Sequence, residues 1–202
     1  MLDVAKIEKL FLDSIDVKSA IIENGLLSQI AKMGDIAVNS IMRGNKLMLC
    51  GNGGSAADAQ HLAAEMLIRL TSNNNREGIP AIALAQDTST ITACGNDFGY
   101  DRLFERTVQA LGKEGDILIA ITTSGNSKNI LLAMEAASVM GIKVFSFLGS
   151  GGGKALNLSD LSFLVPSSDT GRIQESHITA GHALMEYIED HLIEKNYIHL
   201  SK

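Results

Sequence analysis

Four polar side chains that could bind a metal or move a proton lie in two distant parts of the sequence. His61 and Glu65 are four residues apart, and Gln174 and His182 are eight apart, so each pair lies near one face of a predicted helix. Two imidazoles, a carboxylate and a carboxamide could bind a borderline metal such as zinc, although an amide oxygen is an uncommon zinc ligand. The same groups could instead transfer protons. An aldose–ketose interconversion needs a base beside the carbonyl carbon and an acid or metal at the enediol oxygen, and Glu65 and His182 suit these roles.

The other histidines have simpler explanations. A histidine on a helix is more often a hydrogen-bonded core or surface residue than a ligand. His177 lies three residues from Gln174 but points away from His182, so we expect it to be of this ordinary kind. His191 and His199 lie in or after the last polar turns and receive no functional role.

A glycine-rich turn at residues 51–56 has the features of an anion site. It reads Gly-Asn-Gly-Gly-Ser-Ala, directly after a predicted strand and directly before a predicted helix. Glycines let backbone N–H groups approach an anion closely, and a helix N-terminus adds partial positive charge. The spacing also matches the G-x-G-x-x-A of dinucleotide sites, but no acidic residue ends a second strand about twenty residues later, since the next predicted strand ends only near Asp87. The lysine of a P-loop is absent.

A second turn, at residues 122–127, offers four hydroxyls, an amide and a glycine at the end of another predicted strand. Such neutral donors can surround a small phosphate monoester, and the alternative is that they only cap the following helix. In open α/β sheets the loops after the first and third strands are neighbours at the ligand-binding edge, which makes capping alone less attractive. A third glycine-rich turn, at residues 149–153, lacks the hydroxyl cluster, and we expect it to be structural.

The scaffold that must position these turns is predicted to be a doubly wound α/β fold. Residues 2–45 show helical spacing interrupted at Asn24-Gly25, which predicts two helices. From residue 46, β-rich runs alternate with helical segments, as expected for parallel strands joined by crossover helices. The expected strands are residues 46–50, 79–85, 116–122, 142–148 and 161–166, and the expected helices are residues 56–70, 100–111, 129–140 and 172–194. We expect one domain over residues 1–202, with residues 1–45 as a helical extension used for packing or oligomerisation and 46–194 as the α/β core.

Composition limits the classes of partner. The net charge is −6, and the 17 lysines and arginines are scattered, which argues against direct nucleic-acid binding. No apolar run approaches the roughly 20 residues that a membrane span needs, and charges interrupt the first residues too early for a secretory signal. The two cysteines, Cys50 and Cys94, lack metal-finger spacing and suit a reducing compartment. We therefore expect a cytoplasmic protein that binds neither nucleic acid nor membrane.

Several motifs in series resemble the phosphoheptose isomerase family of the sugar isomerase (SIS) domain superfamily. They are Cys-Gly-Asn-Gly-Gly-Ser at 50–55, His61 with Glu65, Gly-Asn-Asp-Phe-Gly at 95–99, Thr-Ser-Gly-Asn-Ser at 123–127, and Arg-Ile-Gln-Glu at 172–175 with His182. The resemblance implies a flavodoxin-like three-layer sandwich with a five-stranded parallel sheet and extra N-terminal helices, assembled as a homotetramer. It also implies that a phosphorylated seven-carbon sugar, sedoheptulose 7-phosphate, is converted to D-glycero-D-manno-heptose 7-phosphate, toward the heptose of lipopolysaccharide or related glycans.

Residue roles follow from the same resemblance, position by position. It implies substrate contacts by Asn52, Gly53, Gly54, Ser55, Glu65, Asn96, Asp97, Thr122, Thr123, Ser124, Ser127 and Gln174. Within this set the hydroxyls of residues 122–127 would hold the phosphate, Asn96 and Asp97 would contact sugar hydroxyls, and Ser55 would cap the first helix of the core. One zinc ion per subunit would be held by His61, Glu65, Gln174 and His182, with Glu65 and His182 also forming the acid and base pair. Whether the metal polarises the substrate or only orders the site stays open, because a coordinated group is a poorer base.

The sequence departs from the family pattern just before Arg172. Some relatives carry an acidic residue where this chain has Gly171, with Asp169 two places earlier, and Thr122 replaces a serine. Two other functions are compatible with the same fold: a non-enzymatic tetramer that binds the bacterial replication initiator, and a regulatory sugar-phosphate sensor. The first needs no proton-transfer pair, and the second usually accompanies a DNA-binding domain, for which the chain has no room.

Overall fold

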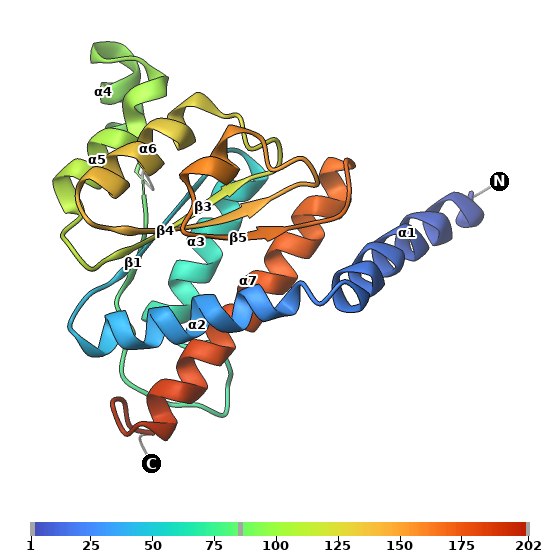
Figure 1. Ribbon diagram of the computed structural model, residues 1–202, viewed down its shortest axis with the longest axis horizontal. Coiled ribbons are helices and arrows are strands. Elements are labelled where there is room, and N and C mark those ends of the chain that lie inside the picture. Colours follow the sequence, from blue (N-terminus) through green and yellow to red (C-terminus); the bar gives the residue numbers. More distant parts are fainter. Residues whose placement is uncertain (1–2, 85–86, 201–202) are drawn as a thin grey trace.

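A five-stranded parallel sheet forms the centre of the protein, with helices on both faces (Figure 1). The computed structural model describes residues 3–84 and 87–200. The strands follow the spatial order β2-β1-β3-β4-β5. Their bounds are β1 (Leu47–Gly51), β2 (Ala81–Ala83), β3 (Ile117–Thr122), β4 (Lys143–Leu148) and β5 (Leu161–Leu164). The predicted three-layer α/β class and its parallel sheet are confirmed.

Most helices lie where the periodicity predicted them. The α-helices are α1 (Val4–Glu23), α2 (Leu27–Met42), α3 (Gly54–Leu67), α4 (Thr88–Asp97), α5 (Leu103–Leu111), α6 (Lys128–Val139) and α7 (Thr170–Glu194). Two short 3₁₀ helices, η1 (Tyr100–Arg102) and η2 (Lys154–Leu158), complete the described elements. The expected break at Asn24-Gly25 separates α1 from α2.

The region from residue 79 to residue 111 differs from the prediction. The strand expected at residues 79–85 is paired only over Ala81–Ala83, and the last residue of that expectation, Ala85, lies outside the described residues. The N–H of Ile79 donates to the carbonyl of Met66 (2.9 Å), so this residue is hydrogen-bonded to the last turn of α3 and not to a neighbouring strand. Asp87 does not follow a long strand either, because its carboxylate accepts from Thr90 N (2.7 Å) and caps the unexpected helix α4. The helix expected at 100–111 begins as the 3₁₀ turn η1.

Alternating strand residues divide the core into two apolar layers. Leu47 and Leu49 of β1 pack on the face that carries α2, α3 and α7, while Met48 and Cys50 pack on the face that carries α5 and α6. Each strand of a doubly wound sheet is buried on both sides, which is why its sequence reads as continuous apolar residues. Burial raises the pKa of the Cys50 thiol to about 12, so this cysteine is an inert core residue.

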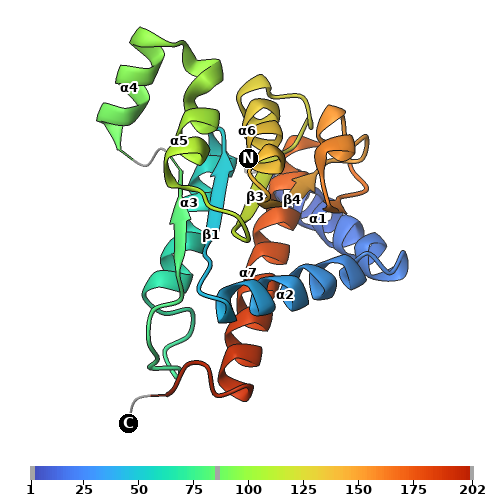
Figure 2. The same ribbon diagram turned by 60° about the vertical axis from the view of Figure 1, so that its left-hand side comes forward.

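The sheet order brings two of the predicted turns to one edge. The chain leaves β1 toward β2 on one side and later reaches β3 on the other side of β1, so the connection direction reverses between β1 and β3. The two strands are in register to their ends, where Gly51 pairs with Ile121. The loops that follow them therefore start side by side at the carboxyl edge of the sheet, where α/β proteins bind ligands (Figure 2).

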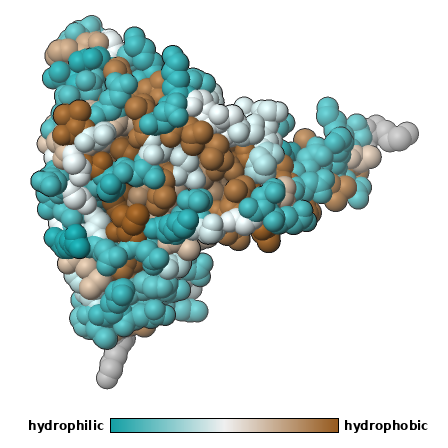
Figure 3. All heavy atoms as spheres, viewed as in Figure 1, coloured by the Kyte–Doolittle hydropathy of each residue, from teal (hydrophilic) through white to brown (hydrophobic). Residues whose placement is uncertain are grey.

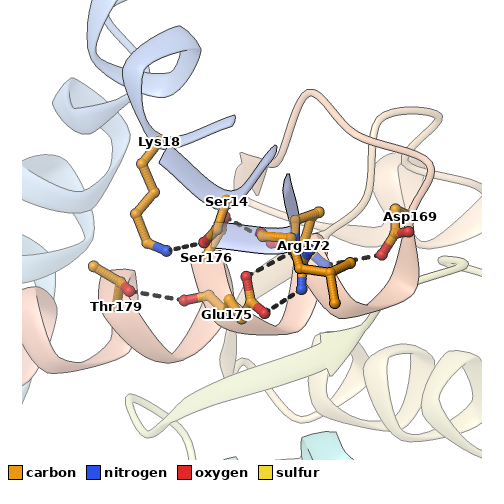
Figure 4. Close-up of polar contacts among 8 residues, drawn as sticks. Ser14, Lys18, Asp169, Arg172, Glu175, Ser176 and Thr179 are labelled. Carbon is orange, nitrogen blue, oxygen red and sulfur yellow. Dashed lines mark hydrogen bonds and ion pairs between the residues drawn. The ribbon is translucent and has the colours of Figure 1, made fainter. Parts of the chain in front are cut away.

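The first helix projects from the body and is fastened to α7 by polar contacts (Figures 1 and 4). Arg172 of α7 donates from Nη1 to the carbonyl of Leu10 (3.0 Å) and pairs with Glu175, while Lys18 Nζ donates to Ser14 Oγ (2.7 Å) on the α1 side. The apolar face of α1 stays exposed. No helix in the described ranges combines the length and apolar character that crossing a bilayer demands.

Candidate functional site

Two helices bring a carboxylate and two imidazoles together. His61 and Glu65 lie on α3, and His182 lies on α7. His61 Nε2 is 2.8 Å from His182 Nε2 and 3.5 Å from Glu65 Oε1, and one candidate ligand atom of each residue lies within 4.8 Å of the others. The two rings meet edge to face. His61 is exposed and the other two side chains are half-buried, so a small molecule can reach this cluster from solvent.

The polar atoms of this cluster fit a bound cation. Glu65 Oε2 and Asp58 Oδ2 are buried and have no hydrogen-bond partner among the described residues. Asp58 lies one turn before His61 on α3; burial raises the pKa of its carboxyl group, and the nearby charges of His61 and His182 oppose that shift. Buried carboxylate oxygens without partners are costly, and a positive ion would satisfy them. Two imidazole nitrogens and a carboxylate oxygen are also the donor types that zinc prefers.

The first glycine-rich turn starts α3 without a side-chain cap. Gly53, with φ of 56°, stands at the N-cap position, and the amides of the first turn face the carboxyl edge of the sheet. Ser55 is buried inside the helix and is not its cap, so the capping role that the resemblance implied for it is wrong. A Cβ added to Gly54 would lie 2.8 Å from Gln174 Nε2. The absence of a side chain at Gly54 therefore lets the carboxamide of Gln174, on α7, lie directly over this turn.

Polar residues of the two turns and of α7 line one pocket. The pocket has a volume of about 70 Å³ and is lined by Asn52, Ser55, Ile121, Thr122, Thr123, Ser127 and Gln174. Ser127 occupies the N-cap position of α6, yet its hydroxyl makes no capping hydrogen bond. Helix capping therefore does not explain Ser127; within the turn, Thr122 Oγ1 donates to Ser127 Oγ (3.4 Å) and Asn126 N donates to Ser124 Oγ (3.2 Å). Ser124 lines an adjoining hollow of about 270 Å³ together with hydroxyls that include Thr170 at the start of α7.

Two residues that were not predicted as part of the site, Tyr100 and Asn129, hold the side chain of Asn52. Asn52 and Asn129 exchange two amide hydrogen bonds (2.9 and 2.8 Å), and Tyr100 Oη donates to Asn52 Oδ1 (2.7 Å). Asn129 is 3% exposed in the first turn of α6, and only its place two residues after the predicted turn at 122–127 could have pointed to this contact from sequence. The network fixes the first turn against α6.

Two other predicted substrate contacts lie apart from this pocket. Asn96 Nδ2 donates to Asp97 Oδ1 (2.7 Å) at the end of α4, and Asp97 lines a separate groove with Phe98 and Arg106. Neither residue lines the pocket between the two turns of its own chain.

Gln174 lines that pocket, and along α7 it is separated from His182 by eight residues, a rise of about 12 Å. The resemblance implied two roles for Gln174, substrate contact and zinc binding. Its location in this pocket suits substrate contact. Asp169, two residues before Gly171, caps α7 by accepting from Arg172 N (3.1 Å).

The remaining histidine of the Gln-x-x-His stretch is a core residue, as the spacing predicted. His177 is buried, its Nε2 lies 3.2 Å from the carbonyl of Leu148, and burial lowers its pKa to about 4. It stays neutral near pH 7 and takes no part in the cluster.

Comparison with known proteins decides the family. Residues 11–149 match the family model described as SIS domain. The chain is 50% identical over 180 residues to a phosphoheptose isomerase of Leptospira biflexa, covering 89% of this chain and 92% of the relative, and 46% identical over 191 residues to one of Aquifex aeolicus, covering 95% and 98%. The chain belongs to the phosphoheptose isomerase family. The solved structure of a phosphoheptose isomerase from Francisella tularensis superposes with a TM-score of 0.88 at 38% identity, over 94% of this chain and all of that one. The family resemblance carried by the motifs is thus confirmed along nearly the whole chain.

Proposed function

We propose that this phosphoheptose isomerase family member converts sedoheptulose 7-phosphate into D-glycero-D-manno-heptose 7-phosphate, a precursor of heptose-containing glycans such as lipopolysaccharide. The proposal depends on one observation: the cluster of His61, Glu65 and His182 and the pocket between the two turns are both built on α3 and α7. Along α3, His61 lies seven residues after Gly54, a rise of about 10 Å. An extended seven-carbon sugar phosphate can bridge that separation between its phosphate and its carbonyl end, whereas a triose phosphate is too short.

The phosphate end is held by neutral donors. Backbone amides at the start of α3 and the hydroxyls of Thr122, Thr123, Ser124 and Ser127 surround the pocket, and the α3 N-terminus adds favourable partial charge. Gln174 contributes its carboxamide from α7. This binding energy orients the far end of the sugar at the proton-transfer groups.

The proton moves between two neighbouring carbons of the substrate. Glu65 takes the proton from C1 of the ketose and returns it to C2. His182 donates a proton to the C2 oxygen as the enediol forms and takes the proton of the C1 hydroxyl as the aldehyde forms, so both groups return to their starting states. His61, Glu65 and His182 would hold the zinc ion that the family implies, one per subunit, whereas the location of Gln174 in the pocket between the two turns favours its other expected role, contact with the substrate. Bound there, zinc would supply polarisation of the substrate oxygens. The two non-enzymatic alternatives need no such pair of proton-transfer groups.

We further propose a cytoplasmic homotetramer assembled through α1. Val4, Ile7, Leu10, Phe11 and Ile15 are 48–71% exposed on this projecting helix, and Figure 3 shows hydrophobic spheres along it. An apolar groove of about 280 Å³ lies beside it, between α1, α2 and α7. Apolar surface of this extent on one helix favours burial against further copies of the chain. Asn96 and Asp97 do not line the pocket between the two turns of their own chain, and we propose that they contact sugar hydroxyls in the site of a neighbouring subunit.

The test combines product analysis with one substitution. Incubation with sedoheptulose 7-phosphate in deuterated water should give the aldose product with deuterium at carbon, since the abstracted proton exchanges with solvent. Glu65→Gln removes the proton acceptor without changing volume and should lower kcat by about 10²–10⁴-fold while inorganic phosphate still binds. Glu135→Gln, at an exposed position on α6, is the matched control and should keep the wild-type rate. A Glu65→Gln enzyme with wild-type turnover would refute the assigned role.

Ketose phosphates of different length provide a second arm of the same test. If the phosphate is anchored at the turns, kcat/KM should fall as the carbon chain is shortened from seven carbons to five. Equal values for both lengths would contradict the proposed span.

A further inference from the structure

A buried ion pair joins the loop after α3 to α7. Arg76 lies in the polar loop between α3 and β2, and Glu189 lies near the C-terminal end of α7, two segments that run side by side in Figures 1 and 2. Arg76 Nε donates to Glu189 Oε1 (2.5 Å), and Asn74 Nδ2 donates to Glu189 Oε2 (2.8 Å). Both charged side chains are 0% exposed. Every oxygen of the carboxylate is therefore occupied, and the pair is shielded from solvent.

The same guanidinium holds the end of α3. Arg76 Nη2 donates to the carbonyl of Glu65 (3.0 Å) and Nη1 donates to the carbonyl of Met66 (2.8 Å). Carbonyls in the last turn of a helix lack intrahelical partners, and a positive charge is favourable at that end. The backbone of Glu65, whose side chain belongs to the proton-transfer cluster, is thus bound directly by Arg76.

Glu189 connects this arrangement to the other half of the cluster. It lies seven residues after His182 on α7, so the two side chains project from nearly the same face, two turns apart. α3 and α7 pack closely along this face, because a Cβ on Gly181 would come within 2.6 Å of Leu62 Cδ1. The ion pair therefore links the end of α3, which carries Glu65, to the helix that carries His182.

Stability alone is a poor explanation for this pair. Removing two charges from water is costly, and an apolar pair of similar volume often stabilises a fold equally well or better. A function in fixing register explains why charged groups occupy a fully buried position here.

We propose that Arg76 and Glu189 are positioning residues for proton transfer: by holding the C-terminal turn of α3 against α7, they keep Glu65 and His182 at the separation that the reaction requires. This inference rests on the proposed function of the cluster. Neither residue touches the pocket between the two turns, so their role concerns turnover rather than phosphate binding.

The decisive variant is Glu189→Gln. The carboxamide keeps the volume but has one acceptor oxygen, cannot satisfy both Arg76 Nε and Asn74 Nδ2, and leaves the guanidinium without its counter-ion. We expect kcat to fall by about tenfold or more, because small displacements of reacting groups are costly, while the affinity for inorganic phosphate stays unchanged. Arg76→Lys keeps the charge but loses the forked geometry, and its kcat should lie between those of the wild type and Glu189→Gln.

A buried carboxylate elsewhere supplies the matched control. Asp116 is 0% exposed, accepts from Lys46 Nζ and from two backbone amides, and lies at the opposite end of β3 from the turns. Asp116→Asn also removes a buried charge at constant volume, so it should lower the free energy of unfolding without lowering kcat at a temperature where the protein is folded.

A spectroscopic measurement separates this inference from the proposed function. The carbon–proton resonances of the His61 and His182 rings, assigned with the corresponding glutamine variants, should shift in Glu189→Gln and not in Asp116→Asn. If the wild-type protein did not convert sedoheptulose 7-phosphate, the proposed function would fail while these resonances still tested the positioning role. Unchanged ring resonances, wild-type kcat in Glu189→Gln, or an equal loss of kcat in Asp116→Asn would each overturn the inference.

Discussion

Replacing Gly125 by alanine tests whether the turn at residues 122–127 holds a phosphate. Gly125 has φ of 64°, and a Cβ added there would lie 2.0 Å from the carbonyl oxygen of Gly152, in the neighbouring turn. The left-handed conformation alone costs an alanine about 1–2 kcal/mol. Ordinary contact for a Cβ begins at 3.4 Å, and the obstructing atom is backbone, so one of the two turns has to shift by more than about 1 Å.

The expected consequences concern both stability and binding. Strain and crowding together should lower the free energy of unfolding by about 2–4 kcal/mol. Binding groups have to be held to within about 0.5 Å, so the shift should weaken the affinity for inorganic phosphate by about tenfold or more. Denaturant unfolding measures the first effect and titration calorimetry with inorganic phosphate measures the second.

A glycine away from the two turns supplies the control. Gly44, after the end of α2, has φ of 80°, and a Cβ there would have no atom within 4 Å, so Gly44→Ala should cost only the strain of the left-handed conformation and leave phosphate affinity unchanged. If Gly125→Ala bound phosphate as tightly as the wild type, or if Gly44→Ala lost the same affinity, the turn at residues 122–127 would not be the phosphate site.

Two further predictions concern stability and assembly. Burial lowers the pKa of His177 to about 4, below the roughly 6.5 of an unfolded histidine, so the unfolded chain takes up this proton first as the pH falls. The free energy of unfolding of the wild type should therefore fall by about 2 kcal/mol between pH 7 and pH 5, and His177→Gln should not show this loss. Denaturant unfolding at both pH values measures the difference, and an identical pH dependence of the two proteins would contradict the buried neutral state. Phe11, 71% exposed on α1, should be covered in the proposed tetramer, so Phe11→Glu should lower the assembly mass in analytical ultracentrifugation without changing the helix content. An unchanged mass would exclude this part of α1 from the interface.

The fold could be predicted because its signals are local and repeated. Uninterrupted apolar runs such as residues 117–122 are buried on both faces, and turns with Gly and Ser mark the strand ends, so the order of strands and helices follows from periodicity. Helix α4 was not predicted because Thr88–Asp97 is rich in threonine and contains a glycine, and both residue types are weak helix formers. Only the capping carboxylate of Asp87 marks the start of this helix. Strand β2 is shorter than its apolar run because Ile79 bonds to α3 instead.

The site could be predicted only in part. His61 and Glu65 share a helix face by simple spacing, but their meeting with His182 depends on how α3 and α7 pack, which periodicity does not specify. Asp58 falls three residues before His61 and could have been found by the same spacing. Arg76 could not, since it lies in a polar loop whose composition indicates solvent exposure, and its burial is set by Glu189, 113 residues later.

The two functional regions differ in what fixes them. The proposed phosphate pocket lies at the ends of two adjacent strands held in register by their ladder, with further lining residues from the starts of the neighbouring helices. The proposed proton-transfer cluster depends on the relative position of two helices, where a slip of one residue along either axis would move a side chain by about 1.5 Å and rotate it by about 100°. Arg76, which binds backbone carbonyls of α3 and the carboxylate of Glu189 on α7, is well suited to prevent such a slip. A buried ion pair has one arrangement in which all its hydrogen bonds are made, whereas apolar side chains can pack in several ways. The catalytic geometry is therefore expected to be most sensitive to changes at Arg76 and Glu189, which lie beyond the cluster itself and outside the phosphate pocket.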